Sequence, residues 1–233
     1  MGSSVYRPVK AVPTEEYVAT DDLPVRSGPA ADIIGPKCRI LLVAINPSPR
    51  STAANLPFAS PSNAFWRLLF ASGLIPVPLG PAAARRLPEF GLGLTSVANR
   101  PTPMASEVST RERREGAVRV REIVSRVRPQ VVALLGPTLA PLFLRPDERT
   151  GVGWKTTRIG TSRVFVLPNP SGRNRAYPGF RAKLLWYRRL AWDLPVTARG
   201  SHRKADTGVG GARSSVGRRR SRSEPVGRRS VLR

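Results

Sequence analysis

Continuous apolar runs alternate along the chain with segments whose apolar residues recur at helical spacing. Uninterrupted apolar runs are typical of strands buried on both faces of a parallel sheet. A Gly160-Thr161-Ser162 turn separates the last two runs, which indicates a strand pair. Five strands are expected in all, at 39–45, 91–97, 130–135, 155–159 and 163–167.

Three segments have the helical pattern, at 61–71, 107–128 and 177–194. In the second of these, Val120, Val124 and Val127 form an apolar stripe beside residues that are largely charged. The order of strands and helices predicts an α/β fold, a three-layer α/β/α arrangement with a central, mostly parallel sheet. Ligands of such folds bind beyond the carboxyl ends of the strands. Two polar loops leave such ends, at 46–61 and 168–177, and we expect the chemistry there.

Both ends of the chain differ in composition from the middle. Residues 1–36 have no sustained period and are expected to form a flexible arm. Residues 199–233 are rich in Gly, Ser and Arg and are expected to be disordered, because they carry too few large apolar residues to offset the entropy of ordering. The folded domain is therefore expected to span 37–198.

The formal net charge is +24. Such an excess indicates a polyanionic partner, and nucleic acid is the first candidate. The alternatives are a basic composition throughout the source proteome or a tail that increases solubility. A tail is an insufficient explanation, because the C-terminal segment carries only roughly +9 and the middle of the chain keeps about +17.

Histidine and cysteine are nearly absent. His202 lies in the C-terminal segment, so the expected domain has no Ser-His-Asp triad and no histidine metal ligand. Cys38 is the only cysteine, which excludes an intrachain disulfide and a structural zinc site. We expect no metal and no cofactor. The sequence has no apolar run of the ~20 residues that a membrane span needs and no signal-peptide pattern, so we expect a cytoplasmic protein without membrane contact.

Two loops carry recognisable motifs. The first, AINPSPRSTAANLPFASPSNAFW, covers 44–66, and the second, LPNPSGRNRAYP, covers 167–178. Together they resemble the mismatch-specific uracil-DNA glycosylase and thymine-DNA glycosylase family, over about 38–195. The segment Asn99-Arg100-Pro101-Thr102 is similar to that family's D/E-R-P-T segment. Three departures stand out: Ala44 and Ser48 where the family usually has glycine, and Ser96 where the bacterial relatives often have lysine.

The resemblance implies a role for particular residues. Asn46 would be the catalytic residue and would hold the attacking water. The base pocket would be formed by Ile45, Ser48, Phe58, Asn63 and Asn169. The DNA-binding and wedge segment would comprise Ser171, Gly172, Arg173 and Arg175.

Structural explanations compete with several of these roles. Asn46 alone could form an Asx turn at the end of a strand. Phe58 could be a core residue, and Asn63 could cap the following helix. Arg173 and Arg175 could contact phosphates instead of filling the gap or reading the opposite strand.

The function predicted from these motifs is that of a monofunctional DNA glycosylase. It would flip and excise uracil, or thymine or a related lesion, from mismatched double-stranded DNA by water attack. An abasic site would remain for base excision repair. Neither motif loop contains lysine, which argues against a Schiff-base lyase step.

Two other functions compete with it. One is a nucleic-acid-binding module on the same fold that has lost catalysis. The other is an unrelated nucleotide enzyme, which the absence of a G-x-x-x-x-G-K loop disfavours. The expected partner is double-stranded DNA, and we expect a monomer.

Overall fold

A computed structural model describes residues 32–194 of the chain. Most of the expected N-terminal arm and the expected disordered tail at 199–233 lie outside the described residues. Within this range, no helix is long and apolar enough to cross a membrane.

Five strands form one sheet: β1 (Ile40–Ala44), β2 (Leu92–Ser96), β3 (Val131–Leu135), β4 (Gly153–Ile159) and β5 (Ser162–Leu167). Their order is β2-β1-β3-β5-β4. The first four in this order are parallel, and β4 pairs antiparallel with β5 at one edge. The carboxyl ends of β1, β2, β3 and β5 therefore lie at the same edge of the sheet, as the alternating pattern predicted.

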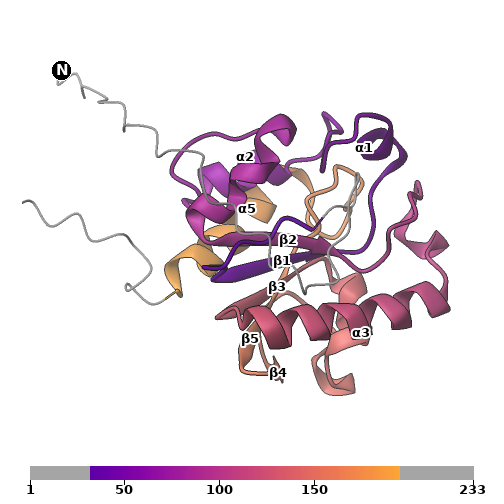
Figure 1. Ribbon diagram of the computed structural model, residues 1–233. Helices are drawn as coiled ribbons and strands as arrows, with labels where there is room; N and C mark the ends of the chain where they lie inside the picture. The colour runs from indigo at the N-terminus through magenta and orange to yellow at the C-terminus, as the bar shows by residue number, and fades with distance from the viewer. Residues whose placement is uncertain (1–31, 195–233) are drawn as a thin grey trace, which may run out of the picture. The chain divides into compact units, whose positions relative to one another are not determined.

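Helices cover both faces of the sheet (Figure 1). The helices α2 (Phe65–Ala71) and α5 (Gly179–Trp192) lie over one face, and α3 (Thr110–Val127) and α4 (Ala140–Phe143) lie over the other. The short α1 (Pro49–Ala53) follows β1. Four 3-10 segments complete the described elements, at Pro81–Phe90, Ala105–Glu107, Pro137–Leu139 and Pro146–Glu148. The expected three-layer α/β/α fold is confirmed.

The central strands are apolar without interruption because both of their faces are buried. Ile40 and Leu42 of β1 pack into the core beneath α2 and α5. Leu41 and Val43 pack into the second core, beneath α3 and α4. Side chains alternate between the two faces of a strand, so one run of apolar residues supplies both cores.

The helix expected at 61–71 begins later than predicted, at Phe65. The backbone N–H of Ala64 donates to the carbonyl of Pro170 at 3.0 Å, in the second motif loop. The N–H of Phe65 donates to Asn63 Oδ1, also at 3.0 Å. These contacts hold 61–64 in a turn, and the helix starts only beyond it.

The boundaries of two other helices also differ from the prediction. The helix expected at 107–128 begins at Thr110, because the Ser109 side chain caps it and accepts from the Glu112 N–H at 3.2 Å. The helix expected at 177–194 spans Gly179–Trp192.

The folded domain extends upstream of the expected boundary at residue 37. Ile33 forms an antiparallel bridge with Leu94 of β2. The fully buried Asp32 carboxylate pairs with Arg119 of α3 at 2.5 Å, and Arg119 also donates to the carbonyl of Ser96 at 2.8 Å. This segment therefore joins the edge strand to the helix layer.

Candidate active site

A cavity of about 180 Å³ opens where the parallel strands end. Its walls come from the ends of β1, β2 and β3 and from the loops that follow β1, β2 and β5. From β1 the chain continues to β2 at one edge of the sheet, and from β3 it continues toward β5 and β4 at the opposite edge. The strand order therefore reverses between β1 and β3. The cavity thus lies where ligands bind in open α/β sheets. Its volume exceeds the ~150 Å³ of an apolar cavity that holds a benzene ring.

None of the lining residues carries a charge. They are Ala44, Ile45, Asn46, Pro47, Ser48, Ser51, Pro57, Phe58, Ser60, Asn63, Leu94, Thr95, Ser96, Thr102, Pro103, Ala105, Leu135, Asn169, Pro170 and Ser171. The polar groups among them are amides and hydroxyls, which suit a neutral ring that has hydrogen-bonding edges.

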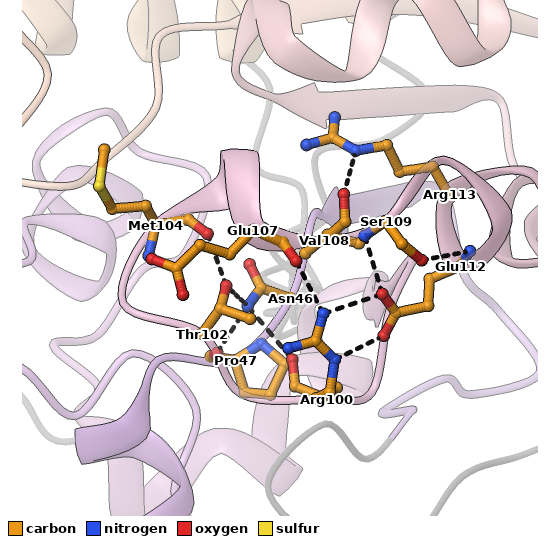
Figure 2. Close-up of polar contacts among 10 residues, drawn as sticks. All are labelled: Asn46, Pro47, Arg100, Thr102, Met104, Glu107, Val108, Ser109, Glu112 and Arg113. Carbon is orange, nitrogen blue, oxygen red and sulfur yellow. Dashed lines mark hydrogen bonds and ion pairs between the residues drawn. The ribbon is translucent and has the colours of Figure 1, made fainter.

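The Asn46 side chain is held in one orientation (Figure 2). Its Nδ2 donates to Thr102 Oγ1 at 2.8 Å, to the carbonyl of Pro47 at 3.0 Å and to the carbonyl of Arg100 at 3.3 Å. The Thr102 hydroxyl donates to the carbonyl of Met104 at 2.6 Å, so it can only accept from Asn46. Because carbonyl oxygens are acceptors, all three contacts require the NH2 end of the amide at this place.

The other end of the same amide is available to a ligand. Within residues 32–194, no donor is bonded to Asn46 Oδ1. Asn46 is half-buried and lines the cavity. The site therefore presents a fixed hydrogen-bond acceptor that can orient a water molecule but is too weak a base to deprotonate it fully.

Contacts of Arg100 with the start of α3 and the residues before it hold the segment that carries the Arg100 carbonyl. Arg100 donates from Nε and Nη2 to the Glu112 carboxylate at 2.8 and 2.9 Å, and to the carbonyl of Glu107 at 2.7 Å. Arg100 and the Ser109 cap lower the pKa of Glu112 to about 2. These bonds hold the Arg100 segment in place, with the Arg100 carbonyl beside Asn46 (Figure 2).

Phe58 and Asn63 lie at the cavity and are also tied to the helix that follows. The Phe58 ring stacks on Phe65, with centroids 3.9 Å apart and an interplanar angle of 21°. Phe58 has a φ of 55°, uncommon for a non-glycine residue. Asn63 accepts the Phe65 N–H through Oδ1 in a turn that precedes α2, and it lines the cavity as well; the N-cap of α2 is Ala64, which has no side-chain cap, so Asn63 is not the N-cap.

Ile45 and Ser48 line the wall that follows β1. The carbonyl of Ile45 accepts from the Ala98 N–H at 2.7 Å, which ties this wall to the loop after β2. Ser48 caps α1, because its Oγ accepts from the Ser51 N–H at 3.2 Å and lies 3.1 Å from Ser51 Oγ. The serine at this departure from the family pattern therefore has a local structural use.

The second motif loop forms the opposite wall. Asn169 Oδ1 accepts from the Ser171 N–H at 2.9 Å, and both residues line the cavity. Gly172 lies against the Ser62 backbone, where a Cβ atom would come within 2.9 Å of the carbonyl oxygen. This contact between the two loops requires glycine at 172, independently of any approach to DNA.

Arg173 and Arg175 are not among the residues that line the cavity. Arg173 is exposed and donates to the carbonyl of Pro103 at 3.0 Å, so it spans two loops at the rim. Arg175 is exposed. Both side chains are accessible from outside the cavity.

Thr102 holds the Asn46 amide, a role that the motifs do not assign to it. The similarity of 99–102 to a family segment and its position directly after β2 are the signals that point to it. The pairing itself joins residues 56 positions apart and follows from the parallel register of β1 and β2. No group of three or more potential metal ligands lies within residues 32–194.

The fold and the site together define an α/β domain with a neutral, amide-lined pocket at the carboxyl ends of its parallel strands. Residues 31–194 match the family model of the uracil DNA glycosylase superfamily, and the chain belongs to this superfamily. A solution NMR structure from Methanosarcina acetivorans, described as that of "a putative Uracil DNA glycosylase", is 20% identical. The match covers 69% of this chain and 95% of that one, with a TM-score of 0.48.

Membership in the superfamily implies a DNA glycosylase, a hydrolase of N-glycosyl bonds that acts on uracil in DNA. DNA is accordingly the partner of this chain. The excess of positive charge agrees with such a partner.

Proposed function

We propose that this protein is a monofunctional glycosylase that removes uracil from mismatched double-stranded DNA by water attack. Thymine and related lesions are secondary candidates. The observation that carries the proposal is the fixed amide of Asn46, a residue that lines the cavity: its Nδ2 donates to three acceptors, and no donor within residues 32–194 is bonded to its Oδ1. A duplex base reaches such a cavity only after it has left the stack, so the proposal includes base flipping.

The chemistry needs no charged side chain in the pocket. The C1′–N1 bond of the deoxyuridine breaks, and its electron pair leaves with the uracil ring. The oxygen of the water held by Asn46 Oδ1 forms the new bond to C1′. The water's proton passes to solvent, because an amide is a poor base, and solvent later protonates the uracil anion.

Two further amides are suited to the departing base. Asn63 and Asn169 each use Oδ1 to accept a backbone N–H, which directs the NH2 end elsewhere. No acceptor within residues 32–194 is bonded to either Nδ2. These donors could bind the carbonyl oxygens of uracil and stabilise the charge that develops on them.

Phe58 supplies an aromatic wall for the flipped base. Aromatic faces stack on any base, so Phe58 would contribute affinity and little selectivity. Discrimination among bases would then come from the amides and from Ser48. In the DNA, Arg173 would fill the gap left by the base, and Arg175 would contact the opposite strand.

The experiment that tests this function is excision from a set of labelled duplexes that differ at one pair. The duplexes carry G·U, A·U or G·T, and an all-paired A·T duplex is the control. We expect breakage only after alkali treatment, fastest for G·U. Equal rates for G·U and A·U would refute the mismatch preference. Retained binding without release of any base would instead indicate a binding module.

A further inference from the structure

Met104 is an exposed apolar residue at the rim of the cavity. Its relative exposure is 59%, which places it among five exposed large apolar side chains of the described residues. A single exposed apolar residue is ordinary on a protein surface. What distinguishes Met104 is its position, because Pro103 and Ala105 on either side both line the cavity and Met104 does not.

The turn that carries Met104 is bonded to both sides of the site. The Met104 carbonyl accepts from Thr102, which in turn accepts from Asn46. The neighbouring Pro103 carbonyl accepts from Arg173 of the second motif loop at 3.0 Å. Figure 2 shows the Met104 thioether extending away from Asn46 and Thr102. The backbone is thus anchored toward the catalytic amide, and the side chain is left outside.

We propose that Met104 inserts into the duplex beside the flipped nucleotide and acts as a second wedge. This inference rests on the proposed glycosylase function and adds a DNA-contacting residue to it. Proteins that unstack DNA insert apolar side chains between base steps, and methionine is one of the residues they use. A flexible thioether also adapts to an irregular gap.

The gain from such insertion comes from burial. Methionine removed from water between bases gains the free energy of apolar transfer, which offsets part of the cost of unstacking the neighbouring step. This gain is largest when the flanking pairs are fully stacked. It becomes smaller when they are already loose, because an unpaired base costs less to move.

The test compares single-turnover excision by Met104→Leu, Met104→Ala and Met104→Gln on two G·U duplexes. One duplex has paired flanks, and in the other the pair on each side of the uracil is mismatched. Val118→Ala is the matched control, because Val118 is 56% exposed on α3 and lies outside the cavity.

On the paired duplex, we expect Met104→Ala and Met104→Gln to be about tenfold slower than wild type, and Met104→Leu within about twofold. On the loosened duplex, the deficit should fall to about threefold or less. A purely structural role for Met104 would slow both duplexes equally, and that result would overturn the inference. So would full activity of Met104→Ala on the paired duplex. If wild type releases no uracil from either duplex, the proposed function fails and this inference fails with it.

Discussion

The Asn46 amide can present either its nitrogen or its oxygen to the cavity, since a half-turn about the Cβ–Cγ bond exchanges the two. Thr102 contributes the shortest of the three contacts that fix this choice, 2.8 Å from Nδ2. Thr102→Val keeps the shape of the side chain and removes the acceptor. We expect kcat to fall about tenfold, the rate equivalent of one hydrogen bond, with KM little changed.

Thr102→Ser restores the hydroxyl and is the control for this prediction. It should recover most of the lost rate in a single-turnover assay on a G·U duplex. A higher KM for Thr102→Val with kcat unchanged would show that Thr102 contacts the DNA and does not position the amide.

The residues in the two motif loops differ in what they contact. Asn46, Phe58 and Asn169 line the cavity, as their loops suggested. The packing of Gly172 against Ser62 requires glycine at this position, and no local sequence pattern predicts this contact. For Thr102, the motif similarity and the position after β2 marked the segment, but the contact with Asn46 could not be predicted because it depends on how two parallel strands align.

At Gly116, helix α3 lies directly against the residue that follows β2. A Cβ atom on Gly116 would lie within 2.0 Å of the Val97 carbonyl, just beyond β2. Gly116→Ala would therefore push the helix off the sheet and destabilise the fold by about 3 kcal/mol, the upper part of the usual overpacking range. Urea denaturation would measure the loss.

Arg114→Ala, at an exposed position of the same helix, is the control and should change stability by less than ~0.5 kcal/mol. A similarly small change for Gly116→Ala would mean that α3 does not pack against β2 as described.

The strands and the long helices could be predicted because their apolar pattern reflects burial on one or two faces. Their ends could not, because tertiary contacts decide them. The turn at 61–64 shows this, since Ala64 bonds to Pro170 in a loop more than 100 residues away. The five-residue α1 is too short to show a period, and the 3-10 segment Pro81–Phe90 contains Pro88, a residue that argues against a helix interior.

Across the whole molecule, the excess of positive charge lies outside the candidate active site. The lining of the cavity is uncharged, although the chain carries a net +24. We therefore expect DNA affinity to fall steeply with salt while the single-turnover rate at saturating enzyme changes little. Removal of residues 199–233 should make the plot of log K for DNA binding against log salt concentration less steep and leave the single-turnover rate unchanged.

Fluorescence anisotropy between 50 and 200 mM salt would provide the slopes, and the full chain provides the reference. An unchanged slope after truncation would mean that these residues make no contact with phosphates. A lower single-turnover rate would mean that they contribute to the chemical step.

The most direct test of the central claim compares Asn46→Ala with wild type on a labelled G·U duplex under single-turnover conditions. Asn99→Ala, an exposed asparagine outside the cavity, is the matched control. We predict a loss of about 100-fold or more for Asn46→Ala with duplex binding retained, and no loss for Asn99→Ala. Uracil release by Asn46→Ala at the wild-type rate would contradict the assignment of Asn46 as the residue that holds the attacking water.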